Sequence, residues 1–216
     1  MINILILIFS IIFLCGLLFY EKREKGVLLL ITKSILSLLF LITALLQPHS
    51  IPAYYHYLLI GLIFCLIGDV CLALPRESAF KVGLLAFLIG HIFYIFSFSS
   101  LIPISYWISS GIFVLLGMSA SIFFWLRPHL KSMLIPVSLY IVIITVMVIG
   151  SWAVFWKSSL RISGRALILA GALSFYFSDV FVARDKFIKE EYQNRLLNLP
   201  LYYAGQFMLA FSVGHL

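Results

Sequence analysis

Charged residues are scarce in this sequence. Only 11% of its 216 residues are Asp, Glu, Lys or Arg, whereas a soluble domain carries about a quarter. This scarcity excludes an ordinary water-exposed surface around a buried core. Instead, 63% of the residues are hydrophobic, and apolar stretches of about 20 residues, long enough to cross a bilayer as a helix, recur along the chain. We therefore expect an all-α, polytopic membrane protein.

Long polar segments are missing as well. The loops between the apolar stretches are too short to hold a soluble domain, so we expect residues 1–216 to form a single integral membrane domain of about eight transmembrane helices. The first stretch has no basic residues before it and no small-residue cleavage site, which is typical of a retained helix. The expected spans are 2–20, 27–46, 54–74, 80–98, 107–126, 133–156, 165–182 and 197–216.

Cysteine is rare, and no group of residues has the spacing of metal ligands. The three cysteines, Cys15, Cys65 and Cys71, all fall inside apolar stretches, where we interpret them as small packing residues. Four of the histidines lie in loops or at the chain end, without ligand spacing; they are His49, His56, His129 and His215. We therefore expect no metal site and no cofactor.

The basic residues are unevenly distributed among the loops. The formal net charge is +7, but Lys and Arg lie in short runs between apolar stretches and not on one patch, which argues against a nucleic-acid partner. Eleven of them fall in the first, third, fifth and seventh loops, and three in the opposite loops. Because basic loops stay on the cytoplasmic side, we expect a protein of the plasma or inner membrane with both termini outside.

Two apolar stretches carry an aspartate in matching positions. Asp69 and Asp179 each stand eight residues after a glycine and four before an alanine, within the segments 61–73 and 171–183. An intramembrane carboxylate is costly, so it usually faces the protein interior or a wet cavity and serves a function. Small residues on the same helical faces favour close packing against other helices. We expect the two carboxylates to share one cavity.

Further polar side chains are expected at the same depth. With a rise of ~1.5 Å per helical residue, Asp69 and Asp179 both lie roughly 8 Å from the cytoplasmic ends of their helices. The same half of the bundle contains Lys33, His91, Tyr140 and Gln206. A buried lysine generally needs an anionic partner, and Lys33 is the one lysine that we expect to be buried. The sequence therefore predicts one polar layer in the cytoplasmic half, crossing six helices.

Several short polar motifs follow one another from the second helix to the C-terminus. They are Lys33, Gly68-Asp69-Val70, Gly83-Leu-Leu-Ala-Phe-Leu-Ile-Gly-His91-Ile-Phe-Tyr94, Pro136-Val-Ser-Leu-Tyr140, Gly171-Ala-Leu-Ser-Phe-Tyr-Phe-Ser-Asp179 and Gly205-Gln206. In this order the motifs resemble the YhhN-like family of membrane lysoplasmalogenases. The resemblance implies an eight-helix enzyme that hydrolyses the vinyl ether bond of lysoplasmalogens to a fatty aldehyde and a glycerophospho head group.

The resemblance also implies roles for individual residues. The two aspartates of the family match Asp69 and Asp179, which we expect to act as an acid/base pair, since vinyl ether hydrolysis is acid-catalysed and two carboxylates in a dry site share protons unequally. The residues expected to bind the lysophospholipid substrate are Lys33, His91, Tyr140, Gln206 and Ser178. The expected partners are this substrate and membrane lipid, and the oligomeric state is not predicted. The substrate's tail is expected near Phe64, Phe87 and Phe175.

Two other functions fit the same features. Paired intramembrane carboxylates and an internal repeat also suit a proton-coupled transporter of small molecules or lipids. At the repeat offset of Asp69 and Asp179, however, His91 matches Leu201, which argues against a full duplication. A non-catalytic lipid-binding or scaffold protein is the third reading, because intramembrane carboxylates also serve as hydrogen-bonding contacts between helices.

Overall fold

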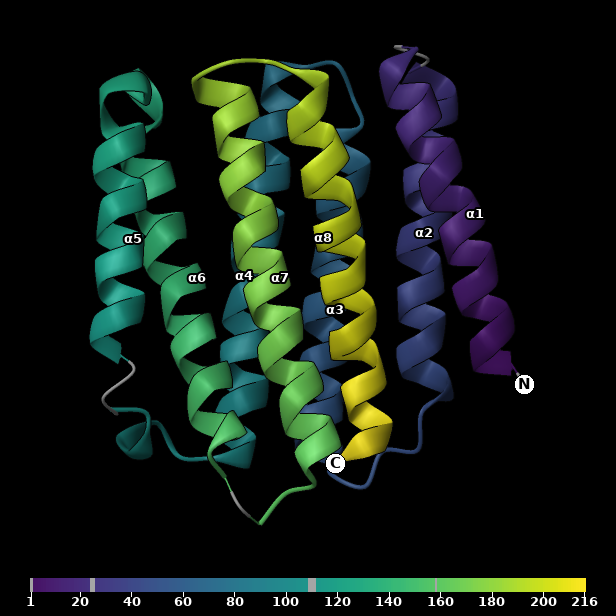
Figure 1. The fold of residues 1–216 in the computed structure, drawn as a ribbon, viewed down its shortest axis with the longest axis vertical. Helices are drawn as coiled ribbons and strands as arrows, with labels where there is room; N and C mark the ends of the chain where they lie inside the picture. Colours follow the sequence, from purple (N-terminus) through teal and green to yellow (C-terminus); the bar gives the residue numbers. More distant parts are fainter. Residues whose placement is uncertain (1, 24–25, 109–111, 158) are drawn as a thin grey trace.

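The fold is a single bundle of long helices standing side by side (Figure 1). The computed structural model describes residues 2–23, 26–108, 112–157 and 159–216, and every regular element in these ranges is helical. Eight helices are long and apolar enough to cross a membrane, which confirms the predicted fold class. Their α-helical parts are α1 (Ile2–Lys22), α2 (Gly26–Leu46), α3 (Pro52–Leu72), α4 (Glu77–Leu101), α5 (Ile112–Leu126), α6 (Leu134–Phe155), α7 (Ile162–Phe187) and α8 (Tyr192–Ser212). The fifth span continues from α5 through a short 3-10 turn to His129.

The two ends of the bundle differ in charge. The joins after α1, α3, α5 and α7 lie at the upper end in Figure 1, and both chain termini lie at the lower end. We call the upper end the basic end; its described cations are Lys22, Arg23, Arg76, Lys81, Arg127, Lys131, Arg184, Lys186, Lys189 and Arg195. The alternation expected from the basic loops is therefore present in the fold.

Some predicted helix boundaries were wrong. Helix α7 continues to Phe187 and α8 begins at Tyr192. The charged residues at this joint form ion pairs with one another, so they can be part of a helix. Trp107, the predicted start of the fifth span, instead follows a short 3-10 turn, and its indole Nε1 donates to the carbonyl of Ile102 at 3.0 Å. Residues 109–111 of that span lie outside the described residues.

Two helix pairs pack most extensively, α3 with α4 and α7 with α8. In the first pair, a Cβ atom on Gly61 would lie 3.0 Å from the carbonyl oxygen of Gly90. In the second pair, a Cβ atom on Gly171 would lie 2.9 Å from the carbonyl oxygen of Gly205, and one on Gly205 would lie 2.9 Å from that of Gly171. The small-residue faces predicted for packing therefore pack, each against the helix that follows it.

The glycine contacts also correct the register of the repeat. Because Gly61 corresponds to Gly171, Gly90 corresponds to Gly205, and the next residues, His91 and Gln206, occupy equivalent positions. The match of His91 with Leu201 was wrong, since α7 extends further beyond its aspartate than α3 does. The repeat thus covers both helices of each pair.

A first prediction tests the glycine contact between α7 and α8. Replacing Gly171 by Ala should destabilise the protein by about 1 to 3 kcal/mol, because the new methyl group collides with backbone that cannot move freely. The matched control is Gly117→Ala in α5, where a Cβ atom meets nothing within 4 Å and alanine favours the helix. Thermal unfolding in detergent measures both, and equal Tm shifts would contradict the prediction.

Candidate active site

A small cavity lies inside the bundle, and its lining comes from every helix from α2 to α8. Its volume is about 90 Å³, which is enough to hold several water molecules. Most of the lining is apolar, and the polar or charged lining residues are Lys33, Asp69, Tyr140, Tyr176, Asp179, Arg195, Asn198 and Tyr202. The structure thus brings Asp69 and Asp179 into one cavity, as the repeat indicated.

Asp69 accepts two hydrogen bonds on one carboxylate oxygen. It lies in the last turn of α3, where Oδ2 accepts from the Ser37 hydroxyl of α2 at 2.6 Å and from the Tyr202 hydroxyl of α8 at 2.6 Å. Lys33 lies one helical turn before Ser37 and lines the same cavity, because residues four apart share a helix face. Asp69 is thus surrounded by donors from two other helices.

Asp179 has a simpler environment. Its Oδ2 accepts one hydrogen bond, from the Tyr140 hydroxyl of α6 at 2.5 Å. The side chain is half-buried, whereas Asp69 is buried. Although the two aspartates occupy matching positions in the repeat, the hydrogen bonds around them differ in number.

Three of the predicted binding residues do not line the cavity. His91 is fully buried, and its ring packs against the rings of Tyr140 at 5.2 Å and Phe175 at 4.7 Å between centroids. Gln206 is also fully buried and accepts a hydrogen bond from the Tyr94 hydroxyl at 2.7 Å. The sequence gives the depth of a residue but not the neighbours on its face, so it could not show that these two side chains lie outside the cavity lining.

Ser178 is the third of these residues. Its hydroxyl oxygen accepts a hydrogen bond from the Asn198 side-chain amide at 3.2 Å, and the Ser178 carbonyl accepts from the same amide at 3.2 Å. Asn198 itself lines the cavity. Ser178 therefore orients a lining residue and does not face the cavity.

Sequence reasoning missed several lining residues, above all Tyr202 and Arg195. Tyr202 is one of 11 tyrosines, and its only local signal is its position one helical turn before Gln206. Arg195 was assigned to a loop, but it lies in the first part of α8 and lines the cavity.

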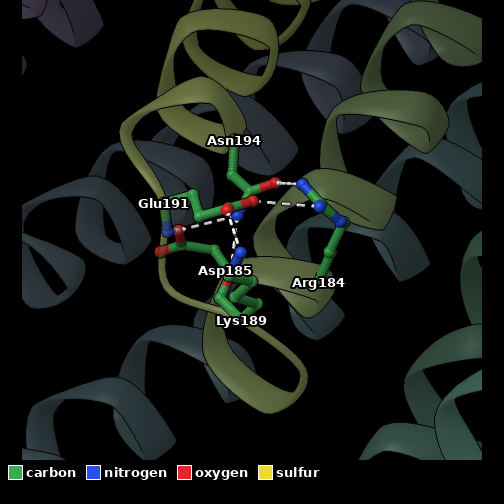
Figure 2. Close-up of polar contacts among 5 residues, drawn as sticks. All are labelled: Arg184, Asp185, Lys189, Glu191 and Asn194. Atoms are coloured by element: carbon green, nitrogen blue, oxygen red, sulfur yellow. Dashed lines mark hydrogen bonds and ion pairs between the residues drawn. The ribbon is translucent and has the colours of Figure 1, made fainter.

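A network of charged and amide side chains joins the end of α7 to the start of α8 (Figure 2). Arg184 pairs with Glu191 at 3.0 Å and also donates to the Asn194 side chain. The Asn194 amide and the Glu191 backbone N–H donate to Oδ1 of Asp185 at 3.1 and 3.2 Å. A hydrogen bond from Lys189 holds the pKa of Glu191 below its usual range.

The same network positions Arg195. Asp185 is buried, and its Oδ2 lies 3.0 Å from a guanidinium nitrogen of Arg195. Because its other carboxylate oxygen is already held by Asn194 and Glu191, Asp185 fixes the arginine where it lines the cavity.

Comparison with known proteins shows which family shares this arrangement. A profile of the YhhN family matches residues 28–213. The chain belongs to the YhhN family. The matched region of this YhhN chain runs from α2 to the end of α8 and includes every lining residue named above.

Curated relatives of this YhhN chain include lysoplasmalogenases. Lysoplasmalogenase TMEM86B of Rattus norvegicus is 30% identical over 161 residues, covering 73% of this chain and 62% of the relative. Lysoplasmalogenase TMEM86A of Homo sapiens is 31% identical over 159 residues, covering 71% and 63%. The matched region thus spans less than two thirds of these relatives. No solved structure matches.

A second prediction tests the network at the start of α8. Asp185→Ala should destabilise the protein by about 2 to 4 kcal/mol, because it leaves the Asn194 amide and Arg195 without their buried acceptor. The control is Glu77→Ala, which breaks an exposed pair with Lys81 and should cost at most about 1 kcal/mol. Thermal unfolding in detergent compares the two, and a control that loses as much as Asp185→Ala would refute this role for the network.

Proposed function

We propose that this protein is a membrane hydrolase that cleaves the vinyl ether bond of lysoplasmalogens. The products are a fatty aldehyde and a glycerophospho head group. The observation that supports this most directly is a pair of carboxylates with unequal hydrogen bonding in one small cavity. The lysoplasmalogenase relatives support the choice of bond and of lipid.

The reaction needs a proton donor and a base in the same place. A proton adds to the outer carbon of the vinyl group, an oxocarbenium ion forms, water adds to it, and the hemiacetal separates into aldehyde and alcohol. One water molecule is consumed, and no redox change occurs. In a dry cavity the charge on one carboxylate disfavours the charge on the other, so the pair holds one proton between them.

The hydrogen bonds support different roles for the two carboxylates. Donors aimed at a carboxylate favour its ionised form, and Asp69 accepts two of them beside Lys33. Asp69 is therefore the ionised group that stabilises the oxocarbenium ion and accepts a proton from water. Asp179 accepts a single hydrogen bond on Oδ2, which leaves Oδ1 to carry the proton that is delivered to carbon.

The remaining predicted residues act through these groups. Tyr140 orients Asp179 by its hydrogen bond. The His91 ring packs edge to face against the Tyr140 ring and so holds it in place. Ser178 holds Asn198 in the lining. Gln206 accepts a hydrogen bond from Tyr94 and lies outside the cavity lining.

The cavity encloses the reacting bond but not a whole lipid. Its apolar wall contains Phe87, Ile122 and Leu126, whereas Phe64 stacks on Phe93 and Phe175 is fully buried, so neither lines it. With about 90 Å³ available, the long tail lies outside the cavity, toward lipid. The basic end faces the cytoplasm in this proposal, so both termini lie outside and the head group leaves on the cytoplasmic side.

A third prediction tests the two carboxylates. Asp69→Asn and Asp179→Asn should each reduce aldehyde release from a lysoplasmalogen by about 10²- to 10⁴-fold, which is the usual contribution of a general acid or base. Purified protein in detergent is assayed by a coupled aldehyde dehydrogenase, and thermal unfolding verifies that each variant is folded. Glu190→Gln, an exposed carboxyl outside both the cavity and the space toward the basic end, is the control and should keep full activity. Near-normal turnover in both Asp variants would contradict the proposal that Asp69 and Asp179 are the acid/base pair. Lipid uptake without aldehyde release would favour a carrier.

A fourth prediction tests where the proton and the water go. Hydrolysis in deuterium oxide should place a single deuterium on C2 of the aldehyde, because the enol carbon receives the solvent proton. Hydrolysis in oxygen-18 water should leave the head-group hydroxyl unlabelled, since the bond on the vinyl side of the oxygen breaks. Mass spectrometry of the trapped aldehyde and the head group reads both. Label in the head-group hydroxyl would mean cleavage on the glycerol side and a different mechanism.

A further inference from the structure

A second, larger space adjoins the cavity on the side of the basic end. This vestibule has a volume of about 450 Å³ and shares Leu72, Phe80, Val182, Phe187 and Arg195 with the cavity lining. Its other lining residues are Leu74, Pro75, Arg76, Glu77, Lys81, Met133 and Lys186. We call this space the basic vestibule. The cavity that holds the carboxylates thus shares part of its wall with a space toward the basic end.

The vestibule carries an excess of positive charge. Its four cations are Arg76, Lys81, Lys186 and Arg195, and its one carboxylate is Glu77. Glu77 pairs with Lys81 at 3.0 Å. Within the described residues, Arg76 and Lys186 form no ion pair, and the Lys186 ammonium lies 4.8 Å from the centre of the Phe80 ring. Two cations are therefore available to an anion that enters.

Arg195 stands at the junction of the two spaces. It lines both of them, and a guanidinium nitrogen of Arg195 lies 3.0 Å from Oδ2 of Asp185. An arginine fixed by one carboxylate still presents further N–H donors, and its planar group suits the oxygens of a phosphate. The position of Arg195 is therefore set before a ligand arrives.

The spacing between carboxylates and vestibule matches the proposed substrate. Leu72 and Val182, where the two spaces meet, each follow an aspartate by three residues, an axial distance of about 4.5 Å. In a lysoplasmalogen, three carbons and one oxygen separate the vinyl ether oxygen from phosphorus, roughly 6 Å when extended. When the vinyl ether lies between Asp69 and Asp179, the phosphate reaches the vestibule.

We propose that the basic vestibule binds the phosphate of the lysophospholipid head group, through Arg76, Lys186 and Arg195. The site makes a phosphate-bearing lipid the preferred ligand over the corresponding glycerol ether without phosphate. The identity of the lipid rests on the proposed function, whereas the binding of its phosphate is tested without hydrolysis.

The test is a comparison of two saturated, non-hydrolysable ligands, a 1-alkyl lysophosphoethanolamine and the matching 1-alkylglycerol. Calorimetry in detergent measures the Kd of each for the full chain and for the double variant Arg76→Gln/Lys186→Gln. The variant should bind the phospholipid about tenfold more weakly, a loss typical of charge-assisted contacts, and should bind the alkylglycerol unchanged. Lys131→Gln, at the same end but outside the vestibule, is the control and should change neither.

Two results of the ligand comparison would contradict phosphate binding in the vestibule. Equal loss for both ligands, or no loss for the phospholipid, would overturn the proposal. Inorganic phosphate alone should bind far more weakly than the phospholipid; binding as tight as that of the lipid would assign the vestibule to free phosphate and overturn it as well. If the binding results are as expected but the wild-type protein releases no aldehyde, the proposed hydrolase activity fails while the phosphate site stands.

Discussion

Two carboxylates lie inside a bundle that is otherwise almost entirely apolar, and the arrangement of the helices around them depends on satisfying their hydrogen bonds. A buried carboxylate without donors costs several kcal/mol. Asp69 is therefore met by Ser37 and Tyr202, and Asp179 by Tyr140, so that α2, α6 and α8 each contribute a hydroxyl group. Two of these bonds join consecutive helices, α2 with α3 and α6 with α7, and the third joins α3 to α8, 133 residues further along the chain. The residues of the candidate site consequently also help to hold the bundle together.

The repeated helix pairs explain how two similar aspartates acquire different environments. Glycine contacts give α3–α4 and α7–α8 the same backbone crossing, so the frame around each aspartate is alike. The side chains added to that frame differ: His91 in one pair occupies the position of Gln206 in the other. An acid and a base can therefore arise from one repeated unit when its neighbours diverge.

The sequence predicted the helix number, the alternation of the joins and the shared cavity of Asp69 and Asp179, because each of these can be read from the length of the apolar stretches and from the positions of charged residues along the chain. It did not predict which polar residues line the cavity. His91 and Gln206 have the expected depth, but the direction of each side chain is set by its contact with Tyr140 or Tyr94. Depth along a helix does not predict such contacts. Tyr202 was missed because its hydrogen bond to Asp69 spans 133 residues. The charged end of α7 remained helical because its partners lie on α8 and in the intervening turn.

The small volume of the cavity has a consequence for selectivity. If the protein acts on a lysoplasmalogen as proposed, a volume of about 90 Å³ leaves the hydrocarbon tail of the lipid in contact with other lipid tails, both before and after the head region docks. Moving an alkyl chain from one lipid environment to another gives no hydrophobic gain, so additional methylene groups add almost nothing to affinity. The affinity then depends little on the length of the tail, because the tail stays in contact with the bilayer and not with the protein. Discrimination among lipids rests on the few polar atoms at one end of the molecule.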